Sequence, residues 1–248
     1  MKYQLEVIGF NIEGCIKAQS AGAHRIELCA SPGEGGTTPS YAIIKVAREK
    51  LLIPLYVMIR PRGGDFLYSD DDFEIMKNEV LMCKELNCDG VVFGILTEDG
   101  KVDKERCKIL MEMAYPMQAT FHRAFDRVAN PFESLEDIIE LGFERILTSG
   151  LVPQAYNGKN TLAALVKLAA GRIIIMPGSG VKSSNIIDIA ESTGATELHS
   201  SASIPAESKM NYVNPMMSEK LSTVTVNEEE VKKMVELLKK YEDSNREK

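Results

Sequence analysis

Eight short runs rich in β-branched and other apolar residues recur along the 248-residue chain, and each of the first seven is followed closely by a helix-like stretch. Short apolar runs bounded by turn residues indicate buried strands, and their alternation with helices indicates βα units that build a parallel sheet. The predicted strands are Gln4–Ile8, Arg25–Cys29, Leu55–Arg60, Gly90–Gly94, Gln118–His122, Arg145–Thr148, Arg172–Met176 and Thr196–His199.

Eight such units in about 250 residues predict an α/β fold, a single (β/α)₈ barrel. An open doubly wound sheet is the alternative, but no predicted strand is followed by a G-x-G-x-x-G turn. No boundary interrupts the series, so residues 1–248 are expected to form one domain. The exception to the pattern is Ser200–Asn227, an irregular polar segment before the last predicted helix, Glu228–Tyr241.

Helix starts carry recognisable capping residues. Thr38-Pro39 predicts an N-cap followed by proline in the first turn, and Asn130-Pro131 repeats that pattern. Ser69 precedes three aspartates, which the helix dipole favours at this end of a helix.

Bulk properties exclude several functional classes. The net charge is −7 and no basic block is present, which argues against a nucleic-acid partner. No stretch approaches the roughly 18 apolar residues of a membrane span, and the N-terminus runs directly into a strand pattern instead of a signal peptide. The five cysteines are odd in number and scattered, so we expect reduced thiols and a cytoplasmic protein.

Strand alternation predicts which charged residues point into the barrel. In Arg25–Cys29 the apolar Ile26 and Leu28 should face the helices, so Arg25, Glu27 and Cys29 face inward. The same rule turns five further side chains inward: Glu6, Arg60, His122, Glu197 and His199. Buried charges are costly unless paired, so the glutamates are expected to meet Arg25, Arg60 or Arg123. The result is either a structural ion-pair network or a polar site that such pairs support.

The densest cluster is His122-Arg123-Ala124-Phe125-Asp126, at the end of the fifth strand. Carboxyl ends of strands form the active face of a barrel, which makes His122, Arg123 and Asp126 candidate catalytic residues. His199 ends the eighth strand and can reach the same opening. His24 starts its strand and falls on the opposite face.

Glycine-rich loops after the sixth and seventh strands are candidates for holding an anionic group. They contain Ser149 and the run Gly178-Ser179-Gly180. Backbone N–H groups in such loops bind phosphate or carboxylate, although a tight turn needs glycine as well. Arg60, which begins Arg60-Pro61-Arg62-Gly63-Gly64, adds a guanidinium suited to clamp an anion.

Soft metal ligands are sparse. The twelve methionines are scattered in apolar contexts and no C-x-x-C occurs, while Cys83 and Cys88 are five residues apart and need not converge. Only Cys29 is placed near the predicted barrel mouth, where it can meet His122 or His199.

Long motifs throughout the chain resemble the CutC family, which is named for copper homeostasis. They are Arg25-Ile26-Glu27-Leu28-Cys29, Glu34-Gly35-Gly36-Thr37-Thr38-Pro39-Ser40, the run from Met58 to Phe66, the run from Thr120 to Asp126, Leu147-Thr148-Ser149-Gly150, Met176-Pro177-Gly178-Ser179-Gly180 and Glu197-Leu198-His199-Ser200-Ser201. The resemblance implies a cytoplasmic, self-associating TIM barrel, hence a homo-oligomer, with a role in copper control. Many relatives have E-V-C in the first strand, where this chain has Glu6-Val7-Ile8.

Two functions remain open. In the first, a copper homeostasis protein holds copper(I), its implied cofactor, through Cys29 with a histidine or methionine. In the second, an enzyme acts on a small anionic metabolite: Arg60 and Arg123 bind the anion, Glu27 or His122 moves a proton, and residues 178–180 hold phosphate. No lysine lies at a predicted strand end, which disfavours Schiff-base chemistry. A barrel that serves only as an interaction scaffold is a third alternative.

Overall fold

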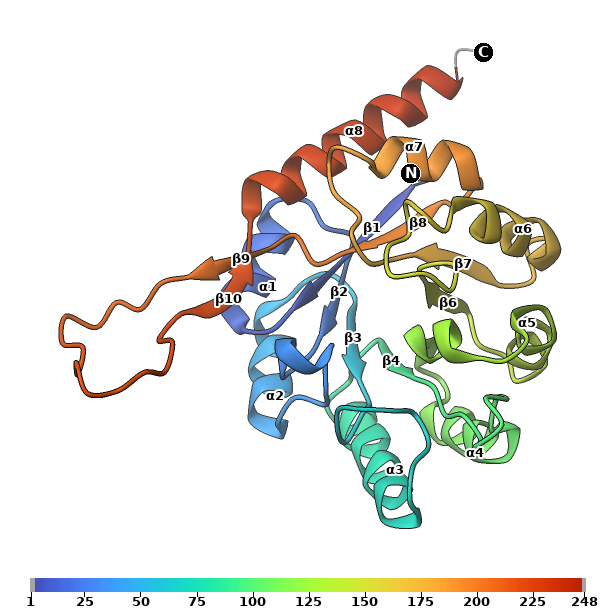
Figure 1. Ribbon diagram of the computed structural model, residues 1–248, viewed down its shortest axis with the longest axis horizontal. Coiled ribbons are helices and arrows are strands. Elements are labelled where there is room, and N and C mark those ends of the chain that lie inside the picture. Colours follow the sequence, from blue (N-terminus) through green and yellow to red (C-terminus); the bar gives the residue numbers. More distant parts are fainter. Residues whose placement is uncertain (1–2, 247–248) are drawn as a thin grey trace.

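The computed structural model describes residues 3–246 and shows a nearly closed barrel of eight parallel strands surrounded by helices (Figure 1). The hydrogen-bonded order is β7-β6-β5-β4-β3-β2-β1-β8, and the seam lies between β7 and β8. The barrel strands are β1 (Gln4–Gly9), β2 (Arg25–Leu28), β3 (Leu55–Met58), β4 (Gly90–Phe93), β5 (Gln118–Phe121), β6 (Arg145–Thr148), β7 (Ile174–Pro177) and β8 (Glu197–Ser200). The sequence prediction of a single TIM barrel is confirmed for the fold class.

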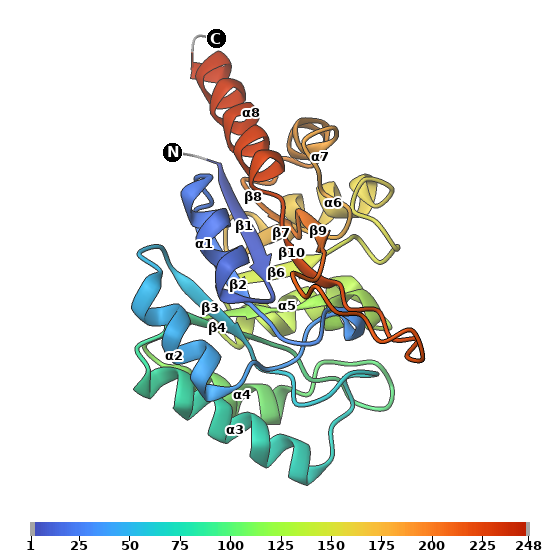
Figure 2. The ribbon, with the colours of Figure 1, turned by 90° about the vertical axis from the view of Figure 1, so that its left-hand side faces the viewer.

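The helices form the outer layer, as Figure 2 shows from the side. They are α1 (Ile12–Ser20), α2 (Tyr41–Lys50), α3 (Asp70–Glu85), α4 (Lys104–Ala114), α5 (Pro131–Glu140), α6 (Lys159–Ala169), α7 (Ile186–Thr193) and α8 (Glu228–Arg246), with 3₁₀ turns η1 (Pro32–Glu34) and η2 (Arg123–Arg127). No helix in this part of the chain is long and apolar enough to cross a bilayer.

The main hydrophobic core lies between the barrel and the helices, as alternation predicts. Ile26 and Leu28 are fully buried in it, together with Leu5 and Val7 of the neighbouring strand. Burying such a side chain contributes roughly 1.5–3 kcal/mol, so this layer supplies much of the driving force for folding. Inside the barrel a smaller apolar cluster remains: Ile8, Cys29, Tyr56, Met58 and Val92.

Two capping predictions are confirmed and one is wrong. The Asn130 side chain accepts the N–H groups of Phe132 and Glu133 at the start of α5, and Ser69 forms a capping box at the start of α3. Thr38 does not cap a helix, because α2 begins later with Ser40 as its N-cap. The Thr38 hydroxyl instead donates to Glu79 (2.7 Å) and accepts the Arg60 N–H (2.7 Å).

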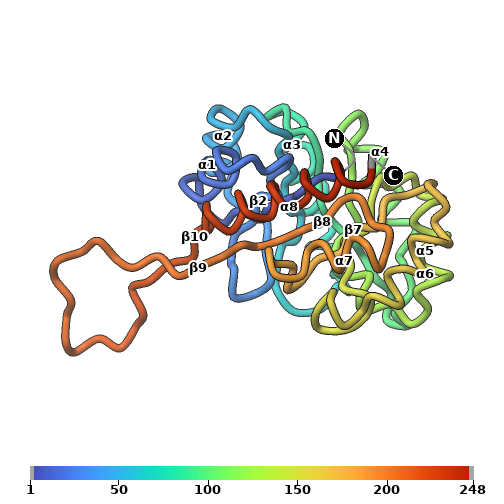
Figure 3. The backbone as a smooth tube through the Cα atoms, turned by 90° about the horizontal axis from the view of Figure 1, so that it is seen from above, coloured from blue at the N-terminus to red at the C-terminus, as the bar shows by residue number. Residues whose placement is uncertain are grey.

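The segment predicted to be irregular contains a two-stranded antiparallel hairpin, β9 (Ser203–Ala206) and β10 (Thr223–Val226). Its connecting loop extends far from the barrel, as Figures 1 and 3 show. The hairpin was missed although β10 alternates threonine and valine, because its partner β9 is a four-residue strand that contains Pro205 and is mostly exposed.

Candidate functional site

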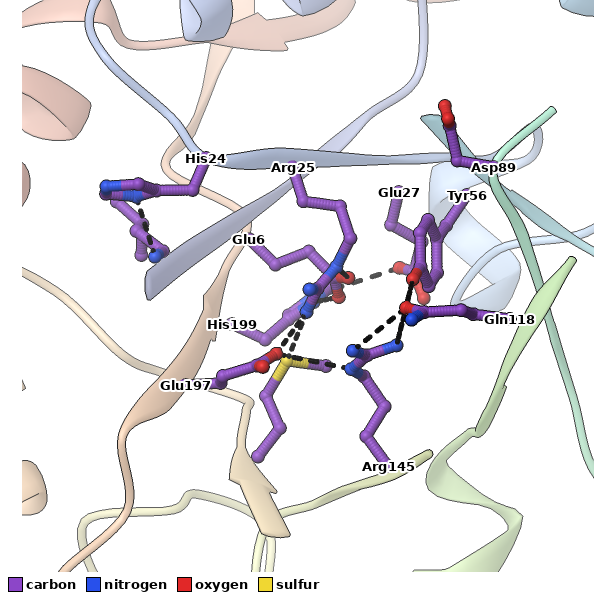
Figure 4. Close-up of polar contacts among 12 residues, drawn as sticks. Glu6, His24, Arg25, Glu27, Tyr56, Asp89, Gln118, Arg145, Glu197 and His199 are labelled. Carbon is purple, nitrogen blue, oxygen red and sulfur yellow. Dashed lines mark hydrogen bonds and ion pairs between the residues drawn. The ribbon is translucent and has the colours of Figure 1, made fainter. Parts of the chain in front are cut away.

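An ion network lies inside the barrel towards the amino ends of the strands and centres on Arg25 (Figure 4). Its Nη2 donates to Glu197 Oε2 at 2.7 Å, and its Nε pairs with Glu6 Oε2. Burial opposes ionisation of Glu6, but the charges of Arg25 and His199 outweigh it and hold the pKa of Glu6 at about 2. The expected pairing of Glu6 and Glu197 with Arg25 is confirmed.

Arg145 completes this network and was not predicted. It opens β6 with its side chain inside the barrel, where Nε donates to Glu197 Oε2 (3.2 Å) and Nη1 to the Tyr56 hydroxyl (3.1 Å). The alternation rule applied to Arg145-Ile146-Leu147-Thr148 would have found it, as it found Arg25. Arg60 and Arg123, the other expected partners, do not pair with these glutamates.

Glu27 and His199 lie beside the network, and each shifts the pKa of the other. His199 Nδ1 is 2.7 Å from Glu6 Oε1, and its Nε2 is 3.8 Å from Glu27 Oε2. Burial disfavours the imidazolium, but the neighbouring carboxyls outweigh it and raise the pKa of His199. Burial, reinforced by Glu6 and opposed by His199, raises the pKa of Glu27 to about 7. Glu27 Oε1 is buried and has no hydrogen-bond partner within residues 3–246.

A pocket of about 720 Å³ opens above these residues at the carboxyl ends of the strands. All six predicted catalytic residues border this pocket: Glu27, Arg60, His122, Arg123, Asp126 and His199. Ligand pockets of proteins have about this volume and combine apolar walls with a few polar groups.

Arg60 holds two loops at the mouth of the pocket. Its Nη1 donates to the carbonyls of Glu34 (2.7 Å) and Gly36 (2.8 Å), and its Nη2 donates to Gly64 O (2.9 Å). The guanidinium lies over the Phe66 ring at 5.1 Å. Arg60 therefore brings a fixed positive charge to the pocket without a carboxylate partner among these contacts.

His122 is a neutral imidazole in a defined tautomer. Its Nδ1 accepts the Ala124 N–H at 3.3 Å, so the single ring proton resides on Nε2. Burial and, second, the charge of Arg60 lower the pKa of His122 to about 3. The Nε2 is buried without a hydrogen-bond partner in the described chain. Phe66, which sequence reasoning missed, packs 4.9 Å from the imidazole centroid.

Asp126 organises the loop after β6. It accepts hydrogen bonds from Arg123 Nε (2.7 Å), Thr148 Oγ1 (2.6 Å) and the N–H groups of Ser149 (3.0 Å) and Leu151 (3.1 Å). This arrangement indicates a positioning role for Asp126. Arg123 extends beside it with a side chain 42% exposed.

The predicted anion-binding loops separate into two groups. Ser179 and Gly180 border the pocket, whereas Ser149 and Gly178 do not. Ser149 is fully buried and its Oγ contacts Asp126. A Cβ at Gly178 would lie 2.4 Å from Leu147 Cδ1 and 3.3 Å from His199 Cβ, so glycine is needed for β7 to pass its neighbours.

Two sets of side chains resemble metal ligands. Glu6, Glu27 and His199 offer atoms within 4.8 Å of one another, but oxygen donors do not suit copper(I), and Glu6 is already paired with Arg25. Cys29 and Met58 provide softer donors in the same apolar cluster. A Cβ at Gly36 would lie 3.2 Å from Cys29 Sγ and 3.6 Å from Met58 Cε, so both side chains flank this glycine.

Cys29 and Met58 provide the sulfur donors that copper(I) prefers, but the protonation state of Cys29 does not suit the metal. Burial and the charge of Glu27 raise the pKa of Cys29 well above its ordinary value, which disfavours the thiolate that binds copper. Ile8 occupies the same cluster as Cys29, where a second thiol would complete a pair. Cys83 and Cys88 do lie together, because the Cys88 N–H donates to the Cys83 carbonyl at 3.0 Å, which their spacing alone did not require.

The fold and the pocket together define a class: a β/α barrel with a partly polar pocket at the carboxyl ends of its strands and a buried ion network in its interior. The CutC family model matches residues 3–204, and the chain therefore belongs to the CutC family.

Three relatives illustrate the membership. The human copper homeostasis protein cutC homolog is 47% identical over 212 residues, which cover 86% of this chain and 78% of the relative. The family protein CutC of Parabacteroides distasonis is 48% identical over 240 residues, covering 94% and 99%. The crystal structure of CutC from Streptococcus agalactiae superposes with a TM-score of 0.77 at 35% identity, covering 80% of this chain and 98% of that one.

Proposed function

We propose that the pocket is the active site of an enzyme that binds a small anionic metabolite and moves a proton on it, with Glu27 as the proton carrier. One observation carries this proposal: Glu27 Oε1 and His122 Nε2 are both buried without a partner among the described residues, and both residues border one pocket. A buried polar atom without a partner costs roughly 1–3 kcal/mol, and a ligand that bonds to it recovers that cost.

The proton affinity of Glu27 suits this role. General acids and bases work best when their pKa is close to the operating pH. The pKa of Glu27, raised by burial to about 7, meets that condition. Arg60 and Arg123 supply positive charge at the same opening, which favours an anionic ligand.

Ligand-induced stabilisation tests the anion site. Thermal unfolding is measured with a panel of phosphorylated and carboxylated metabolites for wild type, Arg123→Gln and the surface variant Arg172→Gln. A ligand at a hundredfold excess over its Kd stabilises by about 2.7 kcal/mol, so we expect a rise of several degrees for wild type and Arg172→Gln and a smaller rise for Arg123→Gln. A panel in which no anion stabilises the protein, or in which Arg123→Gln responds like wild type, contradicts the proposal.

Copper(I) binding at Cys29 and Met58 is a second candidate, with copper as the bound cargo. The observation that favours it is the contact of both side chains with the position of Gly36, in an apolar cluster that borders the pocket. The names of the relatives refer to copper homeostasis, which agrees with this candidate.

Copper uptake against a competing copper(I) chelator tests the second candidate. Cys29→Ser should abolish uptake, Ile8→Cys should increase affinity by adding the second thiol, and Cys83→Ser should leave uptake unchanged. Equal uptake by wild type and Cys29→Ser would eliminate this site.

We also propose a cytoplasmic location and self-association. All five cysteines are free and buried, which is typical of a reducing compartment. The β9–β10 arm, residues 203–226, exposes apolar side chains that a second copy of the chain could cover. They are Ile204, Met210, Tyr212, Val213, Met216, Met217 and Leu221.

A further inference from the structure

We infer that the pocket catalyses enolisation, a proton shift on the carbon next to a carbonyl group, with Glu27 as the base and the Nε2–H of His122 as the donor to the carbonyl oxygen. This inference rests on the proposed function and adds its reaction class. A proton carrier alone is compatible with an aldolase, an isomerase or a hydrolase.

The tautomer of His122 makes it a donor and excludes it as the base. The Ala124 N–H occupies the lone pair of Nδ1, so Nε2 carries the proton. With a pKa lowered by burial and Arg60 to about 3, the ring neither gains a second proton nor accepts one from a substrate at neutral pH. A neutral imidazole whose N–H has no partner, in a residue that borders a pocket, suits a carbonyl oxygen that becomes more negative during the reaction.

Arg60 strengthens that donor. Its guanidinium is tied to three backbone carbonyls, and the Phe66 ring contacts both Arg60 and His122. A fixed positive charge beside the developing oxyanion stabilises it without reorganisation during the reaction.

Glu27 is placed to take the proton. Its Oε2 faces Cys29 Sγ (3.7 Å) and His199 Nε2 (3.8 Å), which leaves Oε1 as the atom without a partner in residues 3–246. The ion network beneath, through Glu6 and Arg25, holds His199 in position. The carboxyl is thereby oriented from behind, and its Oε1 remains buried without a hydrogen-bond partner in a residue that borders the pocket.

The proton shift balances without a co-reactant. Glu27 takes the proton from the α carbon, the C–H electron pair becomes the C=C bond of an enediolate, and the carbonyl π pair moves onto oxygen. Glu27 then returns the proton to the adjacent carbon while a hydroxyl proton passes between the two oxygens, so aldehyde and ketone interconvert. Schiff-base formation lacks its nucleophile, because no lysine is among the described residues that border the pocket.

The residues that line the pocket also indicate the class of substrate. A pocket of about 720 Å³ accepts a compound of metabolite size, and Arg123 with the Ser179–Gly180 loop offers an anion a place at the rim. The expected substrate is a small α-hydroxy carbonyl compound that carries a phosphate or carboxylate group.

Deuterium incorporation from D₂O tests the inference. Dihydroxyacetone phosphate, glycolaldehyde phosphate and hydroxypyruvate are incubated with the protein, and loss of the α C–H signal is followed by proton NMR. We expect exchange above the buffer rate for at least one probe. Glu27→Gln should reduce it by about 10²–10⁴-fold, and His122→Phe, which keeps an aromatic ring beside Phe66, by about 10²-fold or more. The surface variant Glu136→Gln should exchange at the wild-type rate.

Thermal stabilisation by the same probes separates this inference from the proposed function. Probes that stabilise the protein without exchange, or exchange that survives in Glu27→Gln, overturn the enolisation inference and leave the anion site standing. Probes that neither stabilise nor exchange overturn both. Because a variant can fail to fold, ¹⁵N NMR of the wild-type imidazoles provides an independent check: His122 protonated on Nδ1, or charged at pH 7, also overturns the inference.

Discussion

Replacing Arg25 with methionine should destabilise the protein strongly, because the barrel interior depends on its charge. The Arg25 side chain is 5% exposed and bridges Glu6 and Glu197. Methionine has a similar length and no charge, so the variant leaves both carboxylates without this partner while changing the packed volume little.

The magnitude follows from Glu6. Its pKa is held at about 2 against an ordinary value of 4.5, and each pKa unit corresponds to about 1.4 kcal/mol, which gives roughly 3 kcal/mol. A depressed carboxyl pKa stabilises the fold above the unfolded value, so this contribution is complete above pH 4.5 and is lost as the pH falls towards 2. Removing one partner of a buried ion pair typically costs about 3–5 kcal/mol, in agreement.

Urea unfolding followed by circular dichroism measures the effect. At pH 7 we expect Arg25→Met to lose about 3–5 kcal/mol of unfolding free energy, and the loss should shrink as the pH approaches 2. The control is Arg172→Met, which breaks the half-exposed pair with Glu136 and should cost at most about 1 kcal/mol. A loss for Arg25→Met no larger than that of the control, or one independent of pH, would refute the reasoning.

Three further predictions concern the pocket carboxyl, a helix cap and the arm. Glu27→Gln should stabilise the protein by up to about 3 kcal/mol above pH 7, because burial raises the pKa of Glu27 to about 7 and its ionisation opposes folding. The gain should decline as the pH falls from 7 to 4.5 and be absent below 4.5; thermal melting from pH 4 to 9 measures this, and a pH-independent difference contradicts it. Ser69→Ala removes the capping box of α3 and should cost about 1 kcal/mol in urea unfolding; an unchanged midpoint would count against the cap. Replacing residues 207–222 with a short turn should convert an oligomer to a monomer in size-exclusion chromatography while the melting temperature of the barrel stays within a few degrees, and an unchanged oligomer would exclude the arm as the interface.

The barrel could be predicted from the sequence because each strand carries its own apolar run and five of the helices begin with a capping side chain. Alternation alone placed Arg25, Glu27 and Cys29 inside the barrel, where they lie. The ends of the strands were predicted less accurately. The third strand was predicted to end at Arg60 but ends at Met58. Arg60 is buried, as a strand residue would be, but lies outside the strand.

The contacts within the site could not be predicted, since they depend on loops that come from distant parts of the chain. Arg60 was expected to pair with a carboxylate and binds three carbonyls instead, because the loops after β2 and β3 fold over it. The tautomer of His122 depends on a single backbone N–H two residues later. No residue pattern indicates that Glu27 keeps one oxygen without a partner.

The titration of Glu27 tests the central claim most directly. Carboxyl ¹³C NMR across pH 3–9 should show two glutamates that titrate near pH 7, Glu27 and Glu79, because burial raises the pKa of both to about 7. Glu27→Gln should remove one of these resonances and Glu79→Gln the other. If the resonance lost in Glu27→Gln titrates between pH 4 and 5, Glu27 is an ordinary carboxylate at neutral pH and the account of the pocket as a proton-transfer site is wrong.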